Sequence, residues 1–132
     1  MRISIVAPRP EPYLPGGAER VWAGLEAALR AAGHDARLVT LPVPERTLAE
    51  VGRGYRGFAD LDVSDADVVI TSKYPAWMVA HPRHVVWMFH PLRGLYEGYT
   101  VMGLPLDPGE VAPEARALLG EIAGPQRRDR VP

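Results

Sequence analysis

The first 41 residues constrain the fold more than any other part of the chain, because they read as strand, helix and strand in close succession. Residues 2–7 (RISIVA) form a short, β-branched apolar run that is typical of a buried strand. Residues 17–32 carry apolar side chains at helical spacing, and Gly33 stands where a left-handed residue ends a helix. A second strand is predicted at 36–41. Such a unit has parallel strands and a right-handed crossover.

The chain continues with weaker signals of the same kind. Residues 8–16 contain four prolines and are predicted to form a loop. Residues 42–62 have apolar positions at helical spacing, but three glycines weaken the prediction of a helix there. Further strands are predicted at 67–71 and 84–89, with a helical turn at 75–80 between them. The unbroken hydrophobicity of the last strand indicates burial on both of its faces.

These segments together predict an α/β fold, a Rossmann-like three-layer parallel sheet with helices on both faces. Numbered along the chain, the four strands are expected in the order 3-2-1-4 or a close variant. One domain is expected at 1–123, ending in a helix at 113–123. Residues 124–132 are predicted to be a flexible tail.

Composition excludes several classes of function. The formal net charge is -1, so the chain lacks the basic footprint of a nucleic-acid-binding protein. Cysteine is absent, which excludes disulfides and thiolate chemistry and is typical of a protein in a reducing compartment. No apolar run approaches the roughly 18 residues of a membrane span. A cytoplasmic location, with no nucleic acid or membrane span involved, is therefore expected.

Candidate site residues follow three of the predicted strands. In an open parallel sheet, ligands bind outside the carboxyl ends of the strands. The segments that leave these ends contain Gly16, Gly17, Lys73, His90 and Arg93. We therefore expect these five residues to gather at one edge of the sheet.

Two interpretations of the glycine pair in PGGAER stay open at this point. Without a Cβ, Gly16 and Gly17 let a diphosphate approach the start of the helix closely, where amide groups and the helix dipole favour an anion. The alternative is that the glycines only permit the turn. The pattern matches neither the dinucleotide nor the P-loop fingerprint. Glu19, in the first helical turn, competes for the same dipole unless its side chain points away.

The charged candidates also have a plain structural interpretation. His90 follows an apolar strand, where a histidine binds a ligand, shuttles a proton or simply caps the strand end. Lys73 and Arg93 suit an anion, although most surface cations are only solvated. His34, His81 and His84 lack metal-ligand spacing with partners, and no metal site is expected.

The chain resembles a known family in two places. RISIVAP followed by PGGAERVWAGLEAALRAAGHDARLVT resembles the opening of family 4 glycosyltransferases. The stretch VVITSKYPAWMVAHPRHVVWMFHPLRGLYEGY resembles a bacterial subgroup with a similar lysine-aromatic-proline turn and a histidine after the next strand. The resemblance covers roughly residues 1–100.

This resemblance implies a GT-B fold, in which two Rossmann-like domains face each other across a cleft. It implies transfer of a sugar from a nucleotide donor with retention of configuration, as by a hexosyltransferase, without a metal or other cofactor. Gly16 and Gly17 would approach the donor diphosphate or the transferred sugar, and His90 would lie near the reacting sugar. Lys73 matches the subgroup's turn.

Compared with the family's two-domain pattern, this sequence is expected to lack the donor-binding second domain and the last strands of the first domain. Glu11 and Glu19 have the spacing of the family's paired-glutamate motif, but they span prolines and glycines, so we treat the match as coincidence. The chain is therefore expected to be an incomplete N-terminal domain. Either a C-terminal half or a second copy is expected to bind the apolar loops, which contain Tyr13, Leu14, Tyr74, Trp77, Leu92 and Leu95.

Two functions from different classes remain. The first is the acceptor-side half of a nucleotide-sugar-dependent glycosyltransferase, with sugar donor and acceptor as ligands. The second is a noncatalytic binding or partner domain that kept the fold. A flavin-binding or receiver domain of the flavodoxin type is weaker, because the loop after the first strand has neither an acidic pair nor a hydroxyl-rich phosphate cradle.

Overall fold

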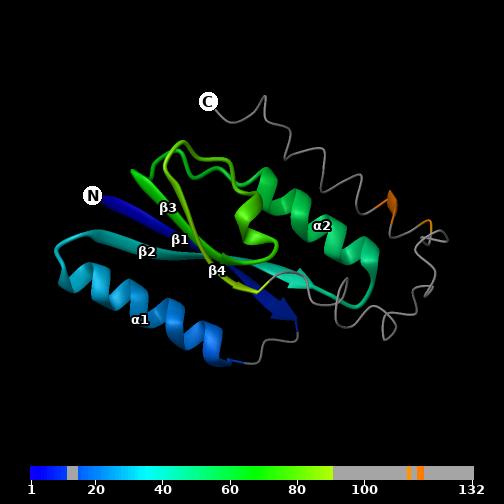
Figure 1. The fold of residues 1–132 in the computed structure, drawn as a ribbon, viewed down its shortest axis with the longest axis horizontal. Coiled ribbons are helices and arrows are strands. Elements are labelled where there is room, and N and C mark those ends of the chain that lie inside the picture. The colour runs from blue at the N-terminus through cyan, green and yellow to red at the C-terminus, as the bar shows by residue number, and fades with distance from the viewer. Residues whose placement is uncertain (12–14, 91–112, 114–115, 118–132) are drawn as a thin grey trace.

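The computed structural model describes residues 1–11, 15–90, 113, 116 and 117 of the chain. Its four strands form one parallel sheet in the order β2-β1-β3-β4 (Figure 1). Along the chain the elements are β1 (Arg2–Glu11), α1 (Gly17–Ala31), β2 (Asp35–Pro44), α2 (Leu48–Ala59), β3 (Val68–Lys73), the 3-10 helix η1 (Ala76–Met78) and β4 (His84–His90).

The two helices cover opposite faces of the sheet (Figure 1), which confirms the predicted three-layer α/β fold. Successive side chains of β1 divide between two cores, as the two-residue period of a strand requires. Ile5 and Ala7 pack with Trp22 of α1, whereas Val6 packs with the residues of α2.

The strand order corrects the prediction at one point. The order 3-2-1-4 placed the third strand beyond β2, but β3 lies on the other side of β1. A right-handed crossover that leaves β2 and passes back over β1 must use the opposite face from α1. α2 lies on that face, so the connection from β1 to β2 and the connection from β2 to β3 cross opposite faces of the sheet (Figure 1).

β1 is longer than predicted, since it continues to Glu11 through two prolines in the segment expected to be a loop. It pairs with β2 along its whole length but with β3 only over residues 3–6. Beyond Val6, one edge of β1 therefore has no partner among the described strands. A proline, which has no amide hydrogen, is tolerated at such an edge, as at Pro8 and Pro10.

α2 forms in spite of its glycines. Its apolar stripe contributes Val51, Tyr55 and Phe58 to the core, all at most 3% exposed. The helix begins at a cap, because the Thr47 hydroxyl accepts a hydrogen bond from the amide of Glu50 at 3.2 Å. This T-x-x-E pattern is a helix-start signal that is readable in the sequence.

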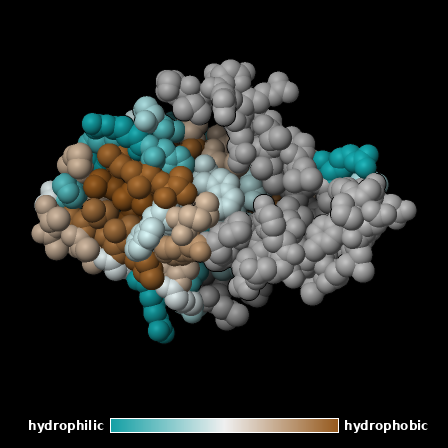
Figure 2. Space-filling model, viewed as in Figure 1, coloured by the Kyte–Doolittle hydropathy of each residue, from teal (hydrophilic) through white to brown (hydrophobic). Residues whose placement is uncertain are grey.

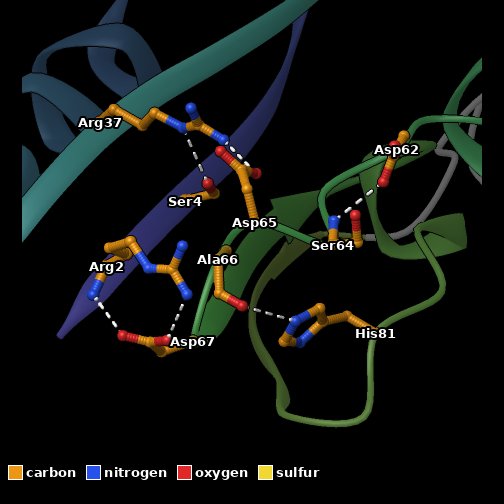
Figure 3. Close-up of polar contacts among 9 residues, drawn as sticks. All are labelled: Arg2, Ser4, Arg37, Asp62, Ser64, Asp65, Ala66, Asp67 and His81. Atoms are coloured by element: carbon orange, nitrogen blue, oxygen red, sulfur yellow. Dashed lines mark hydrogen bonds and ion pairs between the residues drawn. The ribbon is translucent and has the colours of Figure 1, made fainter.

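Paired charges hold together the amino ends of the strands (Figure 3). Asp67 accepts hydrogen bonds from the amide of Arg2 at 2.7 Å and from its guanidinium at 3.0 Å, and these contacts, the amide first, lower the pKa of the Asp67 carboxyl. Arg37 on β2 bridges to Asp65 and to the Ser4 hydroxyl. These aspartates join β1, β2 and the segment before β3, so they have a structural role.

The prediction that β4 is buried on both faces is wrong. Val85, Val86, Trp87 and Met88 are each between 45% and 52% exposed. Figure 2 shows a brown apolar patch over the region where Figure 1 draws β4. β4 is one of the two edge strands of the described sheet, so one of its edges has no neighbour among the described strands. An apolar run predicts burial, but the neighbours of a strand decide whether burial occurs.

Several predictions fall on residues outside the described ranges. Most of the helix at 113–123 and all of the tail at 124–132 lie there, although Pro113, Arg116 and Ala117 are described and helical. Arg93 also lies outside the described residues. Within the described part of the chain, no helix has the length and apolar content to cross a membrane.

The environment of His84 makes stability depend on pH. Its Nε2 shares a hydrogen bond with the Thr71 hydroxyl at 2.8 Å, and burial, followed by the charge of His81, lowers the pKa of His84 from 6.5. The unfolded chain then binds more protons than the folded chain below pH 6.5. We therefore expect the free energy of unfolding to fall as the pH drops through that value toward the folded-state pKa.

Urea denaturation between about pH 8 and about pH 5 measures this dependence. His84→Gln is expected to flatten the profile in that interval, and His34→Gln, in the turn before β2, serves as the matched control. A profile that His84→Gln leaves unchanged would show that another group is responsible.

Candidate functional site

The start of α1 is fixed against β3 and β4 by one side chain. The Trp22 indole N–H donates to the Ser72 hydroxyl at 2.5 Å, and the Trp22 ring stacks on Phe89 at 6.4 Å between centroids and 7° between planes. Trp22 is only 2% exposed, so it is the packing residue that its helical spacing predicted. These contacts bring the helix start, with Gly16 and Gly17, to the carboxyl ends of the strands.

This edge of the sheet contains a topological switch point. The connection after β1 leads to β2 on one side, and the connection after the adjacent β3 leads through η1 to β4 on the other side. Loops that leave two adjacent strands in opposite directions create the crevice in which open α/β sheets bind ligands. Here that position lies between the carboxyl ends of β1 and β3.

The two glycines have different surroundings in the structure. Gly16 precedes α1, and its amide donates to the Glu19 carboxylate at 2.7 Å, so Glu19 does occupy the helix start. A Cβ on Gly16 would lie 3.2 Å from that carboxylate, whereas a Cβ on Gly17 would meet nothing within 4 Å. Among the described glycines, only Gly33 has a positive φ. Neither crowding nor backbone conformation therefore requires a glycine at position 17.

Lys73 and His90 are brought together at the ends of neighbouring strands. Lys73 ends β3, His90 ends β4, and the two are partners in the ladder. The Lys73 ammonium lies 5.3 Å from the centroid of the Tyr74 ring. Both residues thus reach the predicted edge of the sheet, while Arg93 lies outside the described residues.

The predicted apolar contact surface is not formed by the side chains that the structure describes. Tyr74 is 7% exposed, and its hydroxyl donates to Glu45 at 3.1 Å. Burial, and then the Glu45 carboxylate, raise the pKa of the Tyr74 hydroxyl above its usual range. Trp77 is half-buried and packs against the core on the α2 side. Tyr13, Leu14, Leu92 and Leu95 lie outside the described residues.

A cavity of about 800 Å³ lies beside the helix start and was missed by the sequence analysis. β1 and β2 provide its floor, α1 provides one wall, and Arg46 follows β2. The signal was present in Arg9 and Glu11, two polar side chains that continue the alternation of Ile5 and Ala7. It is readable only if the strand is known to continue through the prolines.

Comparisons with known proteins extend these observations no further. A scan against protein-family models, a search of curated proteins and a search of solved structures each found no match. Within the described residues, no group of three or more His, Asp or Glu side chains is arranged to hold a metal ion. The evidence for a function therefore comes from the fold and from the residues at the carboxyl ends of its strands.

Proposed function

We propose that this chain is the acceptor-side half of a nucleotide-sugar-dependent glycosyltransferase, which transfers a sugar only together with a donor-binding half. The observation that carries the proposal is the convergence at the switch point. The start of α1, the end of β3 and the end of β4 reach one edge of the sheet, where Gly17, Lys73 and His90 lie. These are the segments that resemble family 4 glycosyltransferases.

The helix start supplies the chemistry that a donor diphosphate needs. The first amides of a helix have no partner within it, and the helix dipole favours an anion there. Glu19 satisfies the amide of Gly16, which leaves the amides that follow for a phosphate oxygen. The open space at Gly17 allows a ligand to approach its backbone, and this use accounts for a glycine that the fold itself does not require.

The role of His90 is the one that the resemblance implies, whereas those of Lys73 and Arg93 follow from their positive charge. His90, in a strand-end position, lies near the reacting sugar as the candidate catalytic residue. Lys73, and Arg93 beyond the described residues, hold negative charge on the donor or acceptor. Because the nucleotide site belongs to the other half, no transfer is expected from this chain alone.

Gly17→Val is expected to weaken donor binding by about tenfold, because its side chain fills the space through which the ligand approaches. Stability should change by less than about 1 kcal/mol, since the new Cβ contacts nothing and the backbone is unstrained. The measurement pairs urea denaturation with donor binding to the chain and a donor-binding half together.

Gly24→Val is the matched control, because a Cβ at Gly24 also meets nothing within 4 Å and the residue lies farther along α1. Donor affinity that is unchanged in Gly17→Val would return the glycine pair to the turn-forming interpretation.

The proposal as a whole is tested by a transfer assay on the full chain, alone and mixed with candidate donor-binding domains. A panel of UDP-, GDP- and ADP-linked sugars serves as donors. Transfer that appears only in a mixture, with retained anomeric configuration, supports the proposal. Absence of transfer in every mixture contradicts it.

A noncatalytic partner domain is the second candidate, and the exposed apolar side chains of β4 favour it. A contiguous apolar patch on a protein surface commonly marks an interaction site. Binding of a partner that Trp87→Ser abolishes, in a chain that transfers no sugar in any mixture, is the result expected for this function.

A further inference from the structure

The cavity beside α1 lies where the side chains on the α1-facing side of the sheet change from apolar to polar. On the face of β1 that α1 covers, Ile5 and Ala7 are buried, but Arg9 and Glu11 follow them with the same two-residue period. On β2, Leu38 is followed in the same way by Thr40. The strands extend past the first turn of α1, so this polar part of the sheet lines the cavity instead of a packed core.

Two arginines of the cavity differ from four arginines elsewhere in the described part of the chain. Neither the Arg9 nor the Arg46 guanidinium has an ion pair or a hydrogen bond with another described residue. Four other arginines each pair with a carboxylate: Arg2, Arg30, Arg37 and Arg53. Although Glu11 and Glu19 line the same cavity, no ion pair joins them to the arginines.

The rest of the lining is apolar or weakly polar. Trp22, Ala23 and Leu38 contribute hydrocarbon surface, and Thr40 contributes a hydroxyl. The volume of about 800 Å³ lies within the range of small-molecule sites in proteins. Separated charges of both signs over an apolar base suit a ligand that offers both an anion and hydroxyl groups.

We propose that this cavity binds a small polyhydroxylated molecule that carries one anionic group, such as a sugar phosphate or a sugar acid. Arg9 and Arg46 hold the anion by charge-assisted hydrogen bonds. Glu11 and Glu19 accept hydrogen bonds from hydroxyl groups, and the apolar base contacts the C–H face of the molecule. The cavity adjoins the start of α1, where Glu19 contributes to its lining, but the inference does not depend on sugar transfer.

The test is a titration of the full chain followed by NMR of its backbone amides and indole N–H groups. Since phosphate and carboxylate both suit two guanidinium groups, glucose 6-phosphate and glucuronate are titrated in parallel. At least one should bind with a Kd below about 1 mM and shift the signals of Trp22 and Thr40. Glucose and inorganic phosphate, each with half of the features, should bind at least about tenfold more weakly.

Arg9→Gln and Arg46→Gln should each weaken binding of the tighter probe by about tenfold, because each removes one charge-assisted contact. Arg53→Gln, on α2 at the other face, is the matched control and should bind as the wild type does. Ala23→Trp fills the cavity without removing a charge and should abolish binding.

Three outcomes would overturn the inference. The first is that neither probe shifts the cavity signals, and the second is that both arginine variants and Ala23→Trp bind normally. The third is that inorganic phosphate binds as tightly as the sugar probes, because the hydroxyl groups then contribute nothing.

Discussion

Trp22→Ala is expected to lower the free energy of unfolding by about 3–5 kcal/mol, the usual cost of truncating a buried tryptophan. The indole is 2% exposed, stacks on Phe89 and donates to the buried Ser72 hydroxyl. Its loss leaves a cavity and removes the partner of that hydroxyl. Because small domains have only about 5–15 kcal/mol of stability, the variant should be close to unfolding at room temperature. Urea denaturation followed by circular dichroism measures the change.

Two further variants separate the contributions. Trp22→Phe keeps an aromatic ring beside Phe89 but loses the N–H donor, so an intermediate loss of about 1–3 kcal/mol is expected. Trp87→Ala removes a ring that is half exposed, although it contacts Phe89 edge-on, and should cost about 1.5 kcal/mol or less. If Trp22→Ala costs no more than Trp87→Ala, the tryptophan is not what fixes the start of α1.

Gly54→Ala and Gly24→Ala are expected to change stability in opposite directions. In α2, a Cβ on Gly54 would lie 2.9 Å from Cγ1 of Val43, a stiff side chain that is 1% exposed, and 3.5 Å from Pro75. The helix must move away from β2, at a cost of about 1–3 kcal/mol. In α1, a Cβ on Gly24 meets nothing within 4 Å, so the better helix former should stabilise the chain by about 0.5–1 kcal/mol.

A double-mutant cycle identifies the cause of the difference. If contact with Val43 produces the cost, Gly54→Ala should cost much less in a Val43→Ala background, with a coupling energy of about 0.5 kcal/mol or more. A stabilising Gly54→Ala would show that α2 shifts freely on the sheet.

The sequence predicted those elements whose signals are local. α1 was predicted within one residue of its observed end, because the apolar period and Gly33 act within the segment itself. The continuation of β1 through Pro8 and Pro10 was not predictable in this way. Whether a proline interrupts a strand depends on whether its edge is paired, and therefore on the strand order.

The same limit applies to the candidate site. Gly17, Lys73 and His90 lie at the helix start and strand ends where the order of elements placed them, and their roles stay predictions. The cavity with Arg9 and Glu11 was missed because its floor is the part of β1 that had been predicted as loop. The exposure of β4 was also unpredictable, since the apolar run says nothing about which elements cover it.

The unequal pairing of β1 has a consequence for local opening of the backbone. Among the described strands, β1 and β2 continue past Val6 as a two-stranded ribbon, with α2 packed under Val43 and the cavity open on the other face. Two-stranded ribbons are only marginally stable by themselves. Amide hydrogens in the outer part of this ribbon should therefore exchange with solvent faster than those beside β3. A molecule bound in the cavity would cover the open face and slow that exchange. The rate of amide hydrogen exchange in the ribbon would therefore show whether the cavity is occupied.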